Sequence, residues 1–249
     1  MGGLRVVVVA DQRELALEGA DVVCDVLART PDAWAAVATG RSPLGVYAEL
    51  ADRRGSGALD TGAMTAVQLD EYLGAAPDGG PSLFGWMRRS FLEPLGVTDD
   101  RVVRLPLDGD LASGCAAVDR ALDARGGLDL AILGLGRNGH LGFNEPPADR
   151  DAPTRVVRLS STTLGDNARY WGDGDRVPAS AVTMGLRPLL RARTVLLVVS
   201  GAAKHAILRR ALEGPVGPDV PASFLQDGAG DAIVIADRSA WEGEEDTDS

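Results

Sequence analysis

The chain has few of the residues that hold metals or covalent cross-links, with only two cysteines and two histidines among its 249 residues. Cys24 and Cys115 lie in apolar segments expected to be helical, and no CxxC spacing is present. We therefore expect two buried free thiols rather than a disulfide or a metal site. Two histidines also leave few imidazole ligands for a metal centre, so no metal is expected.

Positive charge is scarce as well. The 25 Lys and Arg residues are outnumbered by 36 Asp and Glu residues, which gives a net charge of −11 and a pI near 4.7. Such a field repels nucleic acid and anionic membrane surfaces, so neither is expected as a partner. A small anion remains compatible with this charge, because a local cluster of basic residues acts at close range.

Long apolar runs are also missing: no stretch approaches the length needed to span a bilayer. The opening segment MGGLRVVVVA has too short an apolar run for a signal peptide and lacks a cleavage pattern, which predicts a cytoplasmic protein. A 249-residue chain that is 45% hydrophobic is long enough for one large α/β domain. We expect that domain over residues 1–240, followed by an acidic, disordered tail at 241–249.

Short β-branched runs alternate with helical periodicity, a pattern typical of a single-domain, Rossmann-like α/β fold. Its sheet is open and mostly parallel, with helices on both faces. Strands are predicted at Leu4–Val9, Ala33–Ala38, Thr65–Leu69, Leu128–Leu133, Arg155–Leu159, Thr194–Val199 and Ala232–Ile235. Helices are predicted at residues 14–29, 44–54, 82–92, 111–125 and 202–213.

The stretch LGLGRNGHLGFNEPP at residues 133–147 contains a G-x-G-x-x-G match. A dinucleotide site needs a helix directly after these glycines, but Pro146 and Pro147 block one. The ribose-binding acid expected near residue 159 is also missing. We therefore expect no nucleotide cofactor, and we interpret the glycines as backbone support for His140 and Glu145.

A second loop follows the predicted strand at residues 33–38 and reads TGRSP. Gly40 and Ser42 before a helix present backbone N–H groups and the positive end of the helix dipole to an anion. Arg41 adds a guanidinium that binds two phosphate oxygens at once, which favours phosphate. The alternative is an ordinary serine N-cap with a proline start.

Asp70 and Glu71 follow the predicted strand at residues 65–69. Paired acids at a strand end are often a simple loop entry, and a single histidine such as His140 is often structural. However, ligands of open α/β sheets collect beyond the carboxyl ends of the strands. We therefore expect Asp70, His140 and Glu145 to meet in one crevice as an acid–base set.

Three segments together resemble the signature segments of the glucosamine-6-phosphate deaminase family: ATGRSPLG at 38–45, QLDEYLG at 68–74 and GLGRNGHLGFNEP at 134–146. The similarity runs through nearly the whole chain, including VTMG at 182–185 and ASFLQ at 222–226. The Asn-Glu-Pro of the third segment is similar to the deaminases rather than to the 6-phosphogluconolactonases, which share the fold and the histidine.

The resemblance implies that the chain opens the ring of an amino-sugar phosphate, moves a proton from C2 toward C1 and expels ammonia, without a cofactor. It assigns ring opening to His140, orientation of its imidazole to Glu145 and proton abstraction to Asp70. By the same comparison, the sugar phosphate is bound by Gly40, Arg41, Ser42, Gly139, Arg169 and Lys204.

Three positions depart from the family pattern. Asn138 stands where many members have Asp, so one acid of the catalytic set beside the histidine is replaced by an amide. Val157 stands where a second basic residue is expected, and the chain ends in a short acidic tail, so allosteric activation by N-acetylglucosamine 6-phosphate is not expected. The segment Gly79–Trp86 lacks the usual Ser-Tyr pair, a difference that bears on which sugar epimer is accepted.

The leading prediction is conversion of glucosamine 6-phosphate to fructose 6-phosphate and ammonia. A galactosamine-6-phosphate deaminase is the nearest alternative, and a lactonase of the same fold is another. A non-catalytic sugar-phosphate sensor is a third, although predicted strand residues begin at Leu4 and leave no room for a helix-turn-helix. The pattern leaves open whether the protein is a monomer or a homo-oligomer, and it suggests a substrate lid over residues 166–174.

Overall fold

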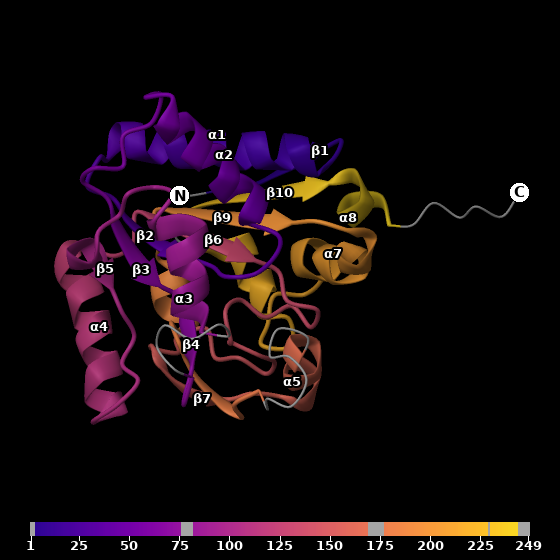
Figure 1. The fold of residues 1–249 in the computed structure, drawn as a ribbon. Coiled ribbons are helices and arrows are strands. Elements are labelled where there is room, and N and C mark those ends of the chain that lie inside the picture. The colour runs from indigo at the N-terminus through magenta and orange to yellow at the C-terminus, as the bar shows by residue number, and fades with distance from the viewer. Residues whose placement is uncertain (1–2, 76–81, 169–176, 229, 244–249) are drawn as a thin grey trace, which may run out of the picture.

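The structure is a computed structural model that describes residues 3–75, 82–168, 177–228 and 230–243 (Figure 1). Its strands form two sheets, one of seven strands and one of three. The seven-stranded sheet has the order β1-β10-β9-β6-β2-β3-β5, and all its strand pairs are parallel. Its members are β1 (Leu4–Val9), β2 (Trp34–Val37), β3 (Thr65–Gln68), β5 (Val102–Val103), β6 (Leu130–Gly134), β9 (Thr194–Val199) and β10 (Asp231–Asp237).

The smaller sheet consists of β4 (Asp70–Tyr72), β7 (Arg155–Arg158) and β8 (Ser180–Thr183), paired antiparallel in the order β4-β8-β7. The prediction that residues 155–159 belong to the parallel sheet is therefore wrong. Along β7 the side chains are alternately half-buried and exposed, as in antiparallel sheets with one face in water. The seventh parallel strand is instead β5, whose two residues are too few to show a period.

The helices are α1 (Gln12–Arg29), α2 (Leu44–Gly55), α3 (Leu83–Met87), α4 (Leu111–Arg125), α5 (Ser161–Asn167), α6 (Leu186–Leu190), α7 (His205–Glu213) and α8 (Arg238–Glu242). All five predicted helices are confirmed. The predicted helix at 82–92 consists of α3 and a π-helical turn at Arg88–Leu92. The one at 202–213 consists of a 3-10 turn at Ala202–Lys204 and α7.

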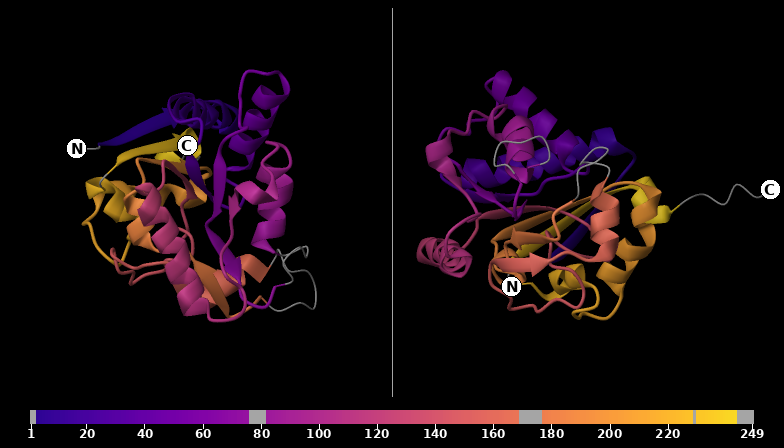
Figure 2. Two further views of the ribbon diagram at one scale, coloured as in Figure 1. Left: turned by 90° about the vertical axis from the view of Figure 1, so that its left-hand side faces the viewer. Right: turned by 60° about the horizontal axis from the view of Figure 1, so that its bottom comes forward.

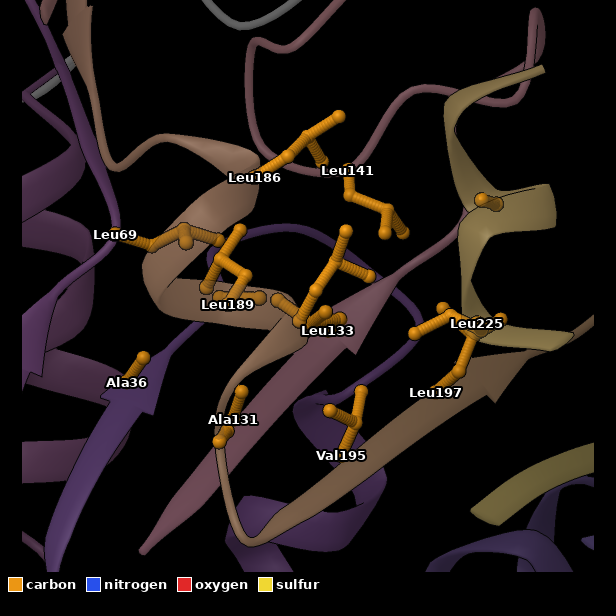
Figure 3. Packing of buried hydrophobic residues seen from close by; sticks show 14 of the residues in the cluster. Ala36, Leu69, Ala131, Leu133, Leu141, Leu186, Leu189, Val195, Leu197 and Leu225 are labelled. Atoms are coloured by element: carbon orange, nitrogen blue, oxygen red, sulfur yellow. The ribbon is translucent and has the colours of Figure 1, made fainter. Parts of the chain in front are cut away.

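Helices cover both faces of the large sheet (Figures 1 and 2). In β2, Ala36 packs into one apolar cluster, whereas Ala35 and Val37 pack into the cluster on the opposite face. Burial on both faces is expected for a parallel sheet. Figure 3 shows that Leu69 and Leu141 belong to the first of these clusters. This packing fixes the two segments that carry Asp70 and His140.

The structure also bears on the expectations for the two cysteines, for membrane-spanning helices and for the C-terminal tail. Both cysteines are free, but only Cys115 is buried, whereas Cys24 is partly exposed. Within the described ranges, no helix is long and apolar enough to cross a membrane. α8 extends to Glu242, two residues into the predicted tail, and residues 244–249 lie outside the described part of the chain.

Candidate active site

Asp70 opens β4, and a single residue, Leu69, separates it from the end of the parallel strand β3. It is therefore the first residue of a strand rather than a loop entry, and it pairs with Thr183 of β8. Its side chain is buried, and Oδ1 has no hydrogen-bond partner among the described residues. Burial, followed by the negative charge of Glu71, raises the pKa of Asp70 to about 7. A carboxyl group in this state exchanges a proton near neutral pH.

Glu71 has opposite surroundings although it is the next residue. It is completely buried, and its carboxylate accepts five hydrogen bonds of 2.8 to 3.2 Å. The donors are Gln68 Nε2, Ser82 Oγ and the backbone N–H groups of Tyr72, Leu83 and Phe84. Glu71 therefore fastens the start of α3 to β4.

The glycines after β6 make room for His140. A Cβ atom on Gly136 would lie 2.2 Å from His140 Nε2, and the Gly136 N–H donates to the His140 carbonyl at 3.0 Å. No helix follows in the chain until α5 begins at Ser161. These contacts support the interpretation that the G-x-G-x-x-G match serves the histidine.

Asn138 orients the imidazole of His140. Its Oδ1 lies 2.7 Å from His140 Nδ1 and also accepts the His140 backbone N–H at 3.3 Å. Since a carbonyl oxygen only accepts, this pair of contacts places the ring proton on Nδ1.

Glu145 lies at the other end of the same loop and is bound to the start of α5. It accepts hydrogen bonds from the Ser160 N–H at 2.7 Å and from the hydroxyls of Ser160 and Thr163. Burial raises the pKa of Glu145, but these hydrogen bonds and the nearby charge of His140 outweigh it and lower the pKa below its usual value. The described hydrogen bond to His140 Nδ1 therefore comes from Asn138, and the contact of Glu145 with His140 is one of charge.

Asn144 holds the loop against the smaller sheet. Its Nδ2 donates to the carbonyls of Leu141 at 2.8 Å and Met184 at 2.9 Å, and its Oδ1 accepts from Arg155 Nη1 at 2.8 Å. The same packing brings Gly142 to Asp70, because a Cβ on Gly142 would lie 3.7 Å from Asp70 Oδ2. Asp70 and the loop of His140 and Glu145 are therefore neighbours, and Asn144 and Arg155 are positioning residues that the sequence interpretation missed.

The loop at residues 39–43 precedes α2, whose N-cap is Pro43, and no side chain caps this helix. The alternative of a serine N-cap is therefore wrong for Ser42. Gly40 has φ +115°, which favours glycine. Tyr47 of α2 donates to the Ala38 carbonyl at 2.9 Å. The strand before this loop pairs Val37 with Gln68 of β3, so the loop begins close to Asp70. Burial and then the charge of Asp70 raise the pKa of Tyr47.

Lys204 and Gly139 lie at the histidine loop as well. Lys204 Nζ donates to the Leu135 carbonyl at 2.7 Å. Gly139 has φ +86°, and its carbonyl accepts the Ala222 N–H at 2.9 Å. Arg169 and most of the predicted lid at 166–174 lie outside the described residues.

Two clefts adjoin this region. One of about 380 Å³ is lined by Glu145, Ser160, Arg155 and Arg158, among others. Another of about 500 Å³ lies between α4 and β7, and neither Asp70 nor His140 lines it. The predicted acid–base set therefore rests on its contacts and not on the larger cleft.

The family model for glucosamine-6-phosphate isomerases and 6-phosphogluconolactonase matches residues 10–234. The chain belongs to this family. A glucosamine-6-phosphate deaminase of Streptomyces coelicolor is 39% identical over 95% of this chain and 92% of its own length. A deaminase of Rhodopirellula baltica is 35% identical over 96% of this chain and 97% of its own length. Family membership thus rests on nearly the whole chain.

Solved structures agree with this membership. A monomeric glucosamine-6-phosphate deaminase matches with a TM-score of 0.90 and 34% identity, over 95% of this chain and 98% of that one. A 6-phosphogluconolactonase from Trypanosoma brucei matches with a TM-score of 0.76 and 18% identity, over 96% and 98% of the two chains. The second match shows the common α/β fold alone.

Proposed function

We propose that the protein converts glucosamine 6-phosphate to fructose 6-phosphate and ammonia without a cofactor. The observation that carries this proposal is the buried Asp70, whose Oδ1 lacks a partner among the described residues and which adjoins the histidine loop. The similarity to deaminases over nearly the whole chain supports the same reaction.

In this proposal His140 opens the sugar ring. Nε2 exchanges a proton between O1 and the ring oxygen, while Asn138 keeps the other proton on Nδ1. Burial raises the pKa of Glu145, but its hydrogen bonds lower it further than burial raises it. Glu145 therefore stays ionised and stabilises the imidazolium form of His140.

Asp70 acts on the open-chain aldehyde. It takes the proton from C2, which gives an enolamine, and returns a proton to C1, which gives an imine at C2. Water adds to that imine, and ammonia leaves as the C2 ketone forms. A carboxyl group with a pKa of about 7 suits both directions of this transfer.

The phosphate group is assigned to the residues predicted to bind the substrate. Gly40, Arg41 and Ser42 precede an uncapped helix, whose free backbone N–H groups and positive dipole end favour an anion. Lys204 brings an ammonium group to the histidine loop. Arg169 completes the proposed set.

An ammonia-release assay tests the proposal, with glucosamine 6-phosphate, galactosamine 6-phosphate and unphosphorylated glucosamine as substrates. We expect release from glucosamine 6-phosphate and formation of a ketose phosphate. Faster release from the galactosamine compound would transfer the assignment to the C4 epimer. Hydrolysis of 6-phosphogluconolactone without ammonia release from any amino sugar would overturn it.

The phosphate assignment has its own test. Lys204→Ala should raise KM for the phosphorylated sugar far more than it lowers kcat. Arg210→Ala, an exposed cation farther along α7, serves as the control and should leave KM unchanged. Equal losses with phosphorylated and unphosphorylated sugars would contradict the assignment.

A further inference from the structure

We infer that Glu71 is a positioning residue whose buried carboxylate, held by five donors directly beside Asp70 in β4, acts together with burial to keep the catalytic proton on Asp70. This inference rests on the proposed function, because it concerns the carboxyl group assigned to proton transfer at C2. It adds to that function a second acid that touches no substrate and acts only through its neighbour.

The charge of Glu71 is fixed in place. Its carboxylate is completely buried and accepts five hydrogen bonds, three of them from backbone N–H groups. Since the donors come from β3, β4 and the start of α3, the side chain has no alternative position.

The other groups that face Asp70 do not replace this charge. Tyr47 on α2 is a phenol whose hydroxyl is engaged by the Ala38 carbonyl. On the side of β8, Thr183 pairs with Asp70 and its hydroxyl accepts the Phe143 N–H. The histidine loop contributes His140, which carries positive charge when protonated, and Glu145, whose carboxylate is held at α5. Glu71 is therefore the adjacent fixed anion.

The proposed proton transfer requires a base with a raised proton affinity. A base that takes a proton from C2 and delivers it to C1 must hold that proton between the two steps, so its conjugate acid should be neither strong nor very weak. Burial and the charge of Glu71, in that order, raise the pKa of Asp70 to about 7. An ordinary exposed aspartate would release the proton too readily.

The test is the pH dependence of kcat/KM for ammonia release by Glu71→Gln. Removal of the like charge should move the acidic limb to lower pH by about one unit, a tenfold change in proton affinity. Ser82→Ala is the matched control, because it removes one hydrogen bond to Glu71 but keeps the charge. We expect its acidic limb to coincide with that of the wild type. An unshifted limb in Glu71→Gln, or an equal shift in Ser82→Ala, would overturn the inference.

If Glu71→Gln does not fold, an infrared titration of the wild type and of Ser82→Ala provides the second measurement. The carbonyl stretch of a protonated carboxylic acid should titrate near neutral pH and disappear in Asp70→Asn. A band that persists in Asp70→Asn would assign the proton to another carboxyl group and overturn the inference. Full ammonia release by Asp70→Asn would show that Asp70 is not the base and would also overturn the inference, whereas absence of ammonia release by the wild type would contradict the proposed function itself.

Discussion

The two ends of the proposed site hold their carboxyl groups in opposite ways. At β4, Asp70 is buried and its Oδ1 has no partner among the described residues, so its pKa rises to about 7. At the far end of the histidine loop, Glu145 is also partly buried, but hydrogen bonds from Ser160 and Thr163 overcome that burial and lower its pKa. Hydrogen-bond donors, rather than burial alone, separate a group that exchanges protons from one that stays charged.

The largest expected effect comes from a substitution of Asp70, the carboxyl group proposed to exchange protons. Asp70→Asn removes the group that transfers the proton, so kcat should fall by about 10³-fold, while KM changes little. Steady-state ammonia release measures this. Activity within about tenfold of the wild type, a barrier change of only about 1.4 kcal/mol, would show that Asp70 is not the base.

The same substitution should change how stability depends on pH. The pKa of Asp70 is 3.8 by reference and about 7 when folded. Because folded Asp70 binds more protons than unfolded Asp70 in that window, the contribution of Asp70 to wild-type stability falls as pH rises from about 4 to about 7. Asn does not titrate, so the free energy of unfolding of Asp70→Asn should increase relative to that of the wild type by up to about 4 kcal/mol over that window. Denaturant unfolding at pH 4 and pH 8 measures the difference, and a constant difference would refute the buried, proton-binding carboxyl.

The histidine side can be disturbed through Gly136. Gly136→Ala places a methyl group where the imidazole lies, so the ring must move and kcat should fall by about 10²-fold. Gly134→Ala is the matched control, since a Cβ there meets nothing within 4 Å. Comparable losses in both variants would show that the effect comes from the strand end rather than from His140.

The smallest expected effect comes from Asn138→Asp. It puts a negative charge at the atom that lies 2.7 Å from His140 Nδ1 and stabilises imidazolium, so the acidic limb of the rate profile should rise by about one pH unit. A closed-ring substrate should show a larger shift than an open-chain analogue, because ring opening is assigned to His140. Superimposable profiles would remove His140 from that role.

The large sheet was predictable because most of its strands are short apolar runs with clear boundaries in the sequence. Leu4–Val9 and Thr194–Val199 have the predicted bounds. β5 has two residues, and β4 follows β3 after a single residue, so neither shows a period of its own. The assignment of residues 155–159 to the large sheet failed because sequence pattern identifies a strand but not its partner.

For the site, residue types were predictable and contacts were not. A loop with His140 and Glu145 after a buried strand indicates acid–base chemistry. Nothing in the spacing shows that Glu145 is bound by Ser160, that Glu71 receives five donors or that Arg155 reaches Asn144. These contacts depend on how the smaller sheet packs beside the large one, which local sequence does not encode.

The edge of the large sheet also bears on the order of events during synthesis. In that sheet β1 has a single neighbour, β10, which pairs Leu4 with Ala232. A ribosome adding about 5–20 residues per second needs on the order of 10 to 50 s to produce that partner. Until then the run Val6–Val9 has no strand to cover it, and such apolar β-branched runs favour aggregation. Arg5 and Asp11 are the nearest charged residues on either side of this run, and flanking charges of this kind disfavour aggregation of an exposed apolar strand.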